Sequence, residues 1–120
     1  MKRALVIVLC ISLIYALYKF YQQTNIDPSL KKIINKGAII IDVRTSKEYS
    51  NGHIKESINI PLGEIRERYT ELDTSKTYIT CCSHGLRSIR VKNLLKERGF
   101  QNVYNGGIWK ELEKIINETK

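Results

Sequence analysis

A strand, a tight loop and a helix are predicted to follow one another without a linker, and this arrangement sets the strongest limits on the fold of the chain. Residues 77–81 (Thr-Tyr-Ile-Thr-Cys) have the composition of a short buried strand, and residues 87–98 have that of a helix ending at Gly99. The loop between them starts with Cys82, and Gly85 allows it to turn tightly. This order directs the first backbone N–H groups of the helix towards Cys82.

The surroundings of Cys82 predict a reactive thiol. The N–H groups at a helix N-terminus carry a partial positive charge, and Arg87 adds a full charge nearby. The thiolate is the nucleophilic form of cysteine, and such surroundings favour it. We therefore expect Cys82 to ionise readily and to act as a nucleophile.

Strands and helices are predicted to alternate along the chain. The continuous apolar run at residues 38–43 is typical of a strand covered on both faces, and Thr45 to Glu48 form a capping-box pattern for a short helix. The other predicted helices cover residues 28–36, 62–72, 87–98 and 108–116, the other predicted strands cover 57–60, 77–81 and 102–104, and a turn is predicted at Gly106-Gly107. In the first helix, Asp27 is the expected N-cap and Pro28 the first helical residue.

This alternation predicts an α/β fold with a parallel β-sheet and helices on both of its faces. The Cys82 loop then lies at the carboxyl end of a strand, where open α/β sheets bind ligands.

The N-terminus is a separate apolar segment. Residues 4–18 carry no charge and lie between Lys2-Arg3 and Lys19. As a helix they span about 22 Å, less than the roughly 30 Å of a bilayer core, and the flanking cations and aromatic residues can make up the difference. We interpret residues 1–21 as a membrane anchor and residues 22–120 as a single domain.

A cleaved signal sequence, which would leave the domain exported or periplasmic, is the alternative for this segment. The residues two places on either side of Ala16, Ile14 and Tyr18, are too large for a cleavage site, which favours the anchor. The cations that directly flank the segment predict a cytoplasmic N-terminus, whereas counting the lysines further along the chain reverses this prediction.

The charge of the chain favours small anionic ligands. It has 20 Lys and Arg against 12 Asp and Glu, a net charge of +8, and the excess persists outside the N-terminal segment. A basic surface attracts anionic substrates or acidic partners, although it also serves solubility. Without a basic block interleaved with aromatic residues, the sequence predicts no nucleic-acid site.

The run Cys82-x-x-Gly85-x-Arg87-Ser88 resembles the active-site loop of the rhodanese sulfurtransferases. Further pieces of the family pattern stand in the same order: Ile41-Asp42-Val43-Arg44, Glu48-Tyr49, Gly52-His53-Ile54 and Ile58-Asn59-Ile60-Pro61 before the loop, and Gly99-Phe100, Asn102-Val103-Tyr104 and Gly106-Gly107-Ile108 after it. The resemblance covers residues 26–113 and implies a rhodanese-like parallel sheet, preceded here by an N-terminal hydrophobic helix.

The resemblance also implies a reaction. Cys82 would attack the outer sulfur of a small anionic donor such as thiosulfate, hold that sulfur as a persulfide and pass it to a thiol or cyanide-like acceptor, without a cofactor. The family's usual arrangement surrounds the persulfide with the loop amides, here those of Ser83, His84, Gly85, Leu86 and Arg87. Arg87 adds charge that attracts an anion. For His84, a hydrogen bond at the rim of the site and an exposed position without a role are both open.

Four neighbouring residues are interpreted as supporting or structural. Asp42 and Arg44 match family positions that brace the site, although a local pair between them is the alternative. Ser88 is expected to contribute a hydroxyl at the helix start. Strand alternation directs Cys81 away from Cys82, which predicts a buried apolar cysteine. Cys81, Cys82 and His84 lack the separated second pair of ligands of a zinc site, so no metal is expected.

Two departures from the family pattern stand out. Lys55-Glu56-Ser57 replaces the usual Pro-Gly-Ala, which should alter a surface turn. The tryptophan of the last helix comes early, at Trp109, so this helix is expected to pack differently.

Two other functions compete with sulfur transfer. Cysteine phosphatases and arsenate reductases need five residues between the cysteine and the arginine, whereas four separate Cys82 from Arg87, which gives a cradle suited to a single sulfur. A non-catalytic, membrane-tethered binding or sensing module is the second alternative, and the retention of Cys82, Gly85 and Arg87 counts against it.

Overall fold

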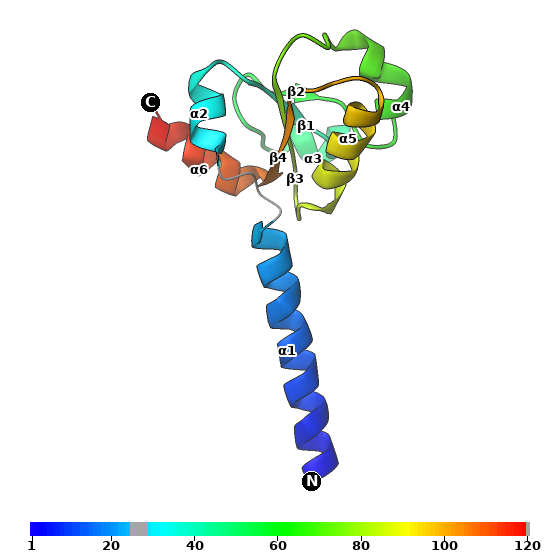
Figure 1. Cartoon of the computed structure of the whole chain (residues 1–120), viewed down its shortest axis with the longest axis vertical. Helices are drawn as coiled ribbons and strands as arrows, with labels where there is room; N and C mark the ends of the chain where they lie inside the picture. Colours follow the sequence, from blue (N-terminus) through cyan, green and yellow to red (C-terminus); the bar gives the residue numbers. More distant parts are fainter. Residues whose placement is uncertain (25–28, 120) are drawn as a thin grey trace.

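A computed structural model of the chain describes residues 1–24 and 29–119. It contains a long N-terminal helix, α1 (Lys2–Thr24), that projects from an α/β unit (Figure 1). The predicted start of the following helix at Asp27 and Pro28 lies outside the described residues.

The α/β unit is built on a four-stranded sheet. Its order is β2 (Ile58–Asn59), β1 (Ile39–Asp42), β3 (Tyr78–Cys82) and β4 (Val103–Ile108), and all neighbouring pairs are parallel. The predicted fold class, an α/β fold with a parallel sheet, is therefore confirmed.

Helices cover both faces of the sheet (Figure 1). One face carries α2 (Leu30–Asn35) and α6 (Trp109–Thr119), and the other carries α4 (Ile65–Arg68) and α5 (Leu86–Glu97). Successive β3 residues alternate between two cores, because Ile79 packs with the α2 and α6 side whereas Tyr78 packs with α5. Apolar surface is buried on both faces of the sheet, and each Å² buried stabilises the layers by about 25 cal/mol.

Residues 45–50 form the short helix that the capping box predicted. In α3 (Ser46–Ser50) the Thr45 hydroxyl accepts from the Glu48 N–H, and the Glu48 carboxylate accepts from the Thr45 N–H. Both hydrogen bonds of the predicted capping box are present, so the prediction is confirmed. It could be made from the sequence because the bonds join residues only three positions apart.

The predicted helix at 62–72 is wrong in its length. The N–H of Leu62 donates to the carbonyl of Val43 at 3.0 Å, so residue 62 still extends the sheet edge. The helix begins only at Ile65 and tightens into a 3₁₀ turn, η1 (Tyr69–Glu71). The apolar spacing indicated the buried side of this segment, whereas the pairing with β1 determined where the helix starts.

The predicted turn at Gly106-Gly107 is also wrong, because both glycines lie inside β4. A Cβ on Gly106 would lie 2.7 Å from Ile79 Cγ2 and 2.9 Å from the Thr80 carbonyl oxygen, so glycine permits the close approach of β4 to β3. The pairing has a bulge between Thr80 and Cys82 and continues to Ile108 opposite Cys82. The last helix therefore starts at Trp109.

Both departures from the family pattern have a structural counterpart. Glu56 has a φ of 69°, the left-handed region that glycine adopts most easily. The Trp109 ring lies against Gly52 and under the guanidinium of Arg44, so this side chain ties α6 to the segment after β1.

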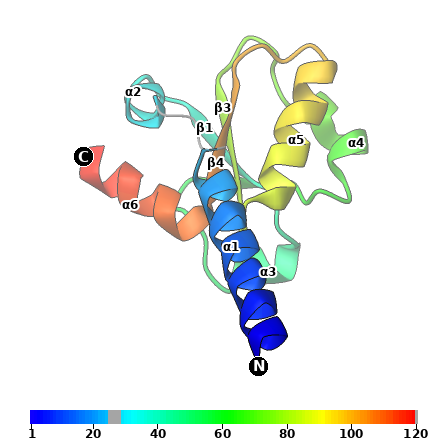
Figure 2. The same ribbon diagram turned by 60° about the horizontal axis from the view of Figure 1, so that its bottom comes forward.

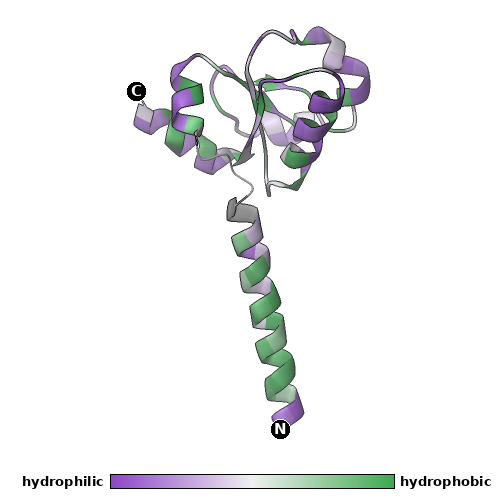
Figure 3. Cartoon of the chain, viewed as in Figure 1, coloured by the Kyte–Doolittle hydropathy of each residue, from purple (hydrophilic) through white to green (hydrophobic). Residues whose placement is uncertain are grey.

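The N-terminal apolar helix is confirmed and is longer than the uncharged run alone. Its 23 residues correspond to about 34 Å, and an 18-residue window within residues 2–21 has a mean hydropathy of 2.1, enough by length and composition to cross a membrane. Hydrophobic residues occupy most of the length of this helix (Figure 3), and their side chains are exposed. A membrane anchor and a signal sequence both have these properties.

Candidate functional site at Cys82

Cys82 is the last residue of β3, and the loop that follows returns directly into α5. Gly85 is the N-cap residue of α5 and has a φ of 93°, so a left-handed residue closes the loop. Leu86 is the first residue of the helix. The strand, loop and helix are thus arranged as the sequence predicted.

Backbone N–H groups point at the sulfur. The Gly85 N–H donates to Cys82 Sγ at 3.0 Å, and the Ser88 N–H does so at 3.4 Å. Cys82 is only 1% exposed, so these donors take the place of water around the sulfur. Hydrogen bonds of this kind stabilise a negative charge on sulfur more than a neutral thiol. The Ser88 amide lies one residue beyond the range 83–87 that we expected to surround the sulfur.

Ser88 connects the helix start to β4. Its buried hydroxyl lies 2.9 Å from the Gly85 carbonyl oxygen and 2.8 Å from Asn105 Oδ1, and Asn105 Oδ1 also accepts from the Gly107 N–H. The Thr80 hydroxyl donates to the Ser88 carbonyl at 2.9 Å. Ser88 was expected at this position, whereas Asn105 was missed. The sequence signal available for it was an asparagine directly before two glycines, and its burial appears only in the structure.

Arg87 is held by a carboxylate that the sequence indicated only as a helix cap. Its guanidinium donates to both Glu48 oxygens, at 2.8 and 3.0 Å, and to the Ser83 hydroxyl at 3.3 Å. The Ser83 hydroxyl donates to Glu48 at 2.9 Å. The Arg87 guanidinium and this hydroxyl hold the pKa of Glu48 well below its usual range. The positive charge expected at the loop is therefore partly neutralised by Glu48.

Asp42 and Arg44 form a buried pair with each other. Arg44 Nη2 lies 2.7 Å from Asp42 Oδ2, and their side chains are 5% and 0% exposed. Arg44 also donates to the carbonyl oxygens of Gly52 and Glu48, at 2.7 and 3.3 Å. The pair thereby positions α3. Because Glu48 of α3 binds Arg87, the pair acts on the loop indirectly, through Glu48.

Cys81 lies on the opposite face of the sheet from Cys82. It packs with Ile79 and Leu112, whereas Cys82 packs with Val91. Burial, followed by the charge of Asp42, raises the pKa of the Cys81 thiol well above its usual range. The neighbouring cysteines therefore have different surroundings, as strand alternation predicted.

The two histidines occupy exposed positions. His53 Nδ1 lies 2.7 Å from the carbonyl oxygen of Tyr49 and its ring stacks on the Tyr49 ring, which accounts for this residue as part of a turn. His84 is exposed in the loop and lines a pocket beside it.

Comparison with known proteins finds relatives that are named as sulfurtransferases. The profile of the rhodanese-like domain matches residues 27–110. The chain is 38% identical over 94 residues to the tRNA sulfurtransferase of Thermoplasma acidophilum, in a match covering 78% of this chain and 18% of that protein. It is also 38% identical over 77 residues to the thiosulfate sulfurtransferase PspE of Escherichia coli, covering 60% of this chain and 71% of that protein.

Solved structures support the same relationship. A rhodanese-related protein from Thermoplasma volcanium matches with a TM-score of 0.59 and 34% identity, over 69% of this chain and 80% of that chain. A structure described as rhodanese with anions, from E. coli, matches with a TM-score of 0.58 and 36% identity, over 62% of this chain and 91% of that chain. The chain spans 18% of the tRNA sulfurtransferase and 44% to 64% of three Bacillus subtilis relatives.

Proposed function

This chain belongs to the rhodanese family, and on that premise we propose that it is a sulfurtransferase whose nucleophile is Cys82. The observation that carries the proposal is the placement of the Gly85 and Ser88 N–H groups around Cys82 Sγ, at 3.0 and 3.4 Å. This cradle suits a negatively charged sulfur, whether the thiolate or the outer sulfur of a persulfide.

The first half of the reaction loads the enzyme. The Cys82 thiolate attacks the outer sulfur of thiosulfate, the sulfur–sulfur bond of the donor breaks, and sulfite leaves with the bonding electron pair. Cys82 then carries the sulfur as a persulfide, and no oxidant or reductant is consumed. Thiosulfate is proposed as the donor because PspE, a relative at 38% identity, is a thiosulfate sulfurtransferase.

The loop and its neighbours have distinct roles in this proposal. Ser83, His84, Gly85, Leu86 and Arg87 surround the donor and the persulfide. Asp42 and Arg44 support that arrangement through α3, without touching the reacting atoms. Ser88 supports it at the start of α5, through its hydroxyl and through its N–H group, which donates to Cys82 Sγ.

We also propose that residues 1–21 anchor the rhodanese-like domain, residues 22–120, in a membrane. The apolar surface of α1 supports this proposal, because an exposed helix of that composition is unstable in water. Resistance of the full chain to carbonate extraction, with an intact N-terminus by mass spectrometry, is the expected result. A processed N-terminus would instead indicate a signal sequence.

The sulfurtransferase proposal is tested with the full chain purified in detergent, by following thiosulfate-dependent formation of thiocyanate from cyanide. Cys82→Ala should abolish turnover, and Cys81→Ala, the matched control on the other face of β3, should retain it. Mass spectrometry after thiosulfate alone should find one added sulfur atom on Cys82. A wild-type protein that neither turns over nor takes up sulfur would favour the binding-module alternative.

A further inference from the structure

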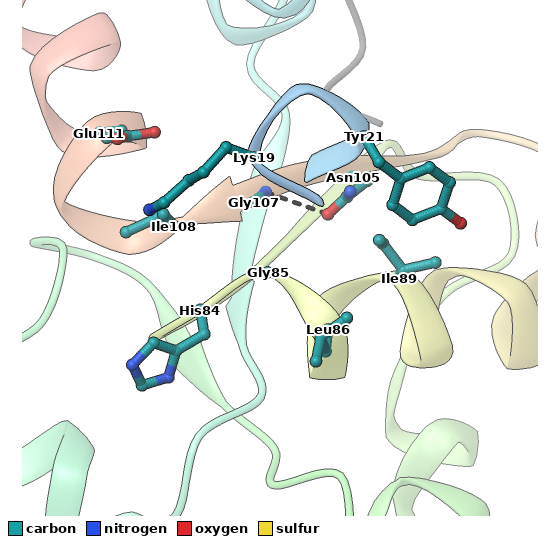
Figure 4. Close-up of a pocket in the computed structure, with 10 residues that line it drawn as sticks. All are labelled: Lys19, Tyr21, His84, Gly85, Leu86, Ile89, Asn105, Gly107, Ile108 and Glu111. Atoms are coloured by element: carbon teal, nitrogen blue, oxygen red, sulfur yellow. Dashed lines mark hydrogen bonds between the residues drawn. The ribbon is translucent and has the colours of Figure 1, made fainter. Parts of the chain in front are cut away.

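A pocket of about 230 Å³ opens beside the Cys82 loop (Figure 4). Four parts of the chain line it: the C-terminal end of α1, the loop with the start of α5, β4 and the first turn of α6. Gly85, whose N–H donates to Cys82 Sγ, is part of its wall. The pocket therefore shares a residue with the cradle of the nucleophile.

The pocket is larger than the reagents of a simple sulfurtransferase assay require. Its volume corresponds to about eight water molecules of liquid. Cyanide fills a small fraction of such a space, whereas an organic molecule with a short chain fills most of it. Size alone thus favours an organic acceptor.

The side chains around the pocket have two kinds of character. Leu86, which is 49% exposed, Ile89 and Ile108 provide apolar surface next to the loop. Lys19 and Glu111 provide one charge of each sign (Figure 4). Binding sites for small organic molecules commonly combine an apolar lining with a few charged groups that orient the ligand.

The contribution of α1 distinguishes this pocket from one formed by the α/β unit alone. Lys19 and Tyr21 lie at the end of α1 that is nearest to β4 and α6 (Figures 1 and 2). The apolar stretch of α1 ends at the same residues. The helix that we propose as the anchor therefore also supplies one wall of the pocket.

We propose that this pocket binds the sulfur acceptor, and that the acceptor is a thiol with an apolar stem and an anionic group. The anionic group would meet Lys19, the stem would lie on Leu86 and Ile108, and the thiol would approach Cys82 past Gly85. This inference rests on the proposed function, because it concerns the second half of the same reaction.

The transfer of sulfur from Cys82 to the acceptor needs no further reagent. The acceptor thiolate attacks the outer sulfur of the Cys82 persulfide and a new sulfur–sulfur bond forms. The bond between that sulfur and Cys82 Sγ breaks, and Cys82 leaves as a thiolate. The product is the persulfide of the acceptor.

The test compares three acceptors with the full chain after loading with thiosulfate: 6-mercaptohexanoate, 6-mercaptohexanol and cyanide. Lys19→Ala should lower kcat/KM for 6-mercaptohexanoate by about five- to tenfold, since one charge-assisted contact is lost. The values for 6-mercaptohexanol and cyanide should change by less than about twofold. Lys2→Ala, which removes the same charge from the other end of α1, is the matched control and should change none of them.

Glu111→Gln gives a change of opposite sign. Removal of this negative charge should raise kcat/KM for 6-mercaptohexanoate and leave that for 6-mercaptohexanol unchanged. An equal fall for all three acceptors in Lys19→Ala, or no effect on 6-mercaptohexanoate in either variant, would overturn the assignment of the pocket.

A binding measurement separates the pocket from the reaction. Hexanoate, which has no thiol, should slow the alkylation of Cys82 by iodoacetamide in the wild type and do so less in Lys19→Ala. Absence of a Cys82 persulfide after thiosulfate would contradict the proposed function, whereas protection by hexanoate would still support the pocket. Equal protection in both proteins, or none in either, would overturn it.

Discussion

Residues 42–48 contribute both members of one arginine–carboxylate pair and the carboxylate of another, and the two pairs have opposite surroundings. Asp42 and Arg44 pair in the interior, with side chains 0% and 5% exposed, whereas Glu48 and Arg87 pair at the rim of the loop, at 36% and 29%. The first pair joins residues two positions apart, and the second joins residues 39 apart.

The difference shows how a stretch of a few residues can serve both the core and the site. A buried ion pair is costly to desolvate, and loss of one partner leaves an uncompensated charge, so the Asp42–Arg44 pair is a structural element. A half-exposed pair contributes little to stability. The Glu48–Arg87 pair instead positions Arg87 and Ser83 in the loop that holds Cys82.

The largest effect is expected from Arg44→Ala. The variant leaves the buried Asp42 carboxylate without its partner and removes the contact with the Trp109 ring, so unfolding should become easier by about 3–5 kcal/mol. Denaturant unfolding followed by circular dichroism measures this change. Arg87→Ala, the matched substitution in the other pair, should cost less than about 1 kcal/mol. Equal losses in the two variants would contradict the distinction between the pairs.

Arg87→Lys should lower turnover and leave the free energy of unfolding nearly unchanged. Lysine keeps the charge but loses the two parallel bonds to Glu48 and the bond to Ser83, so the loop loses its fixed geometry. We expect kcat/KM with thiosulfate and cyanide to fall by roughly 100-fold, since misplacement by about 1 Å can cost that much. Unchanged turnover would show that Arg87 has no positioning role.

The stability contributed by Glu48 should depend on pH. Because the pKa of Glu48 is lowered in the folded chain, the unfolded chain takes up the proton first as the pH falls below the ordinary value of 4.5. The contribution is therefore present above that value and lost as the pH decreases towards the folded pKa. The stability difference between wild type and Glu48→Gln, up to about 1 kcal/mol at pH 7, should start to shrink near about pH 5 and continue to shrink as the pH falls further. A difference that grows on acidification would reverse the assigned sign.

Salt should produce the smallest effect. A double-mutant cycle over Glu48→Gln and Arg87→Gln should give a coupling of about 0.2–1 kcal/mol at low ionic strength. That coupling should fall towards zero in about 1 M salt, because the Debye length shortens to about 3 Å. The cost of Arg44→Ala should change little over the same range, since water and ions do not reach its pair. A salt-independent coupling at Glu48 would place that pair in the interior instead.

Predictions that depend on neighbours along the chain agree well with the structure. The capping box at Thr45 and Glu48 and the opposite directions of Cys81 and Cys82 follow from local periodicity. The errors lie where another strand intervenes. Pairing with Val43 delays the helix after Pro61, and close approach to β3 keeps Gly106 inside a strand.

The same division applies to the candidate site. The strand, loop and helix around Cys82 could be predicted from the sequence, because their signals lie within about twenty consecutive residues. The contact between Glu48 and Arg87, the contact between Asn105 and Ser88, and the place of Lys19 in the wall of the pocket are visible only in the folded chain. These contacts join separate elements, and the relative positions of those elements depend on strand order and register across the sheet, and on where α1 meets the α/β unit.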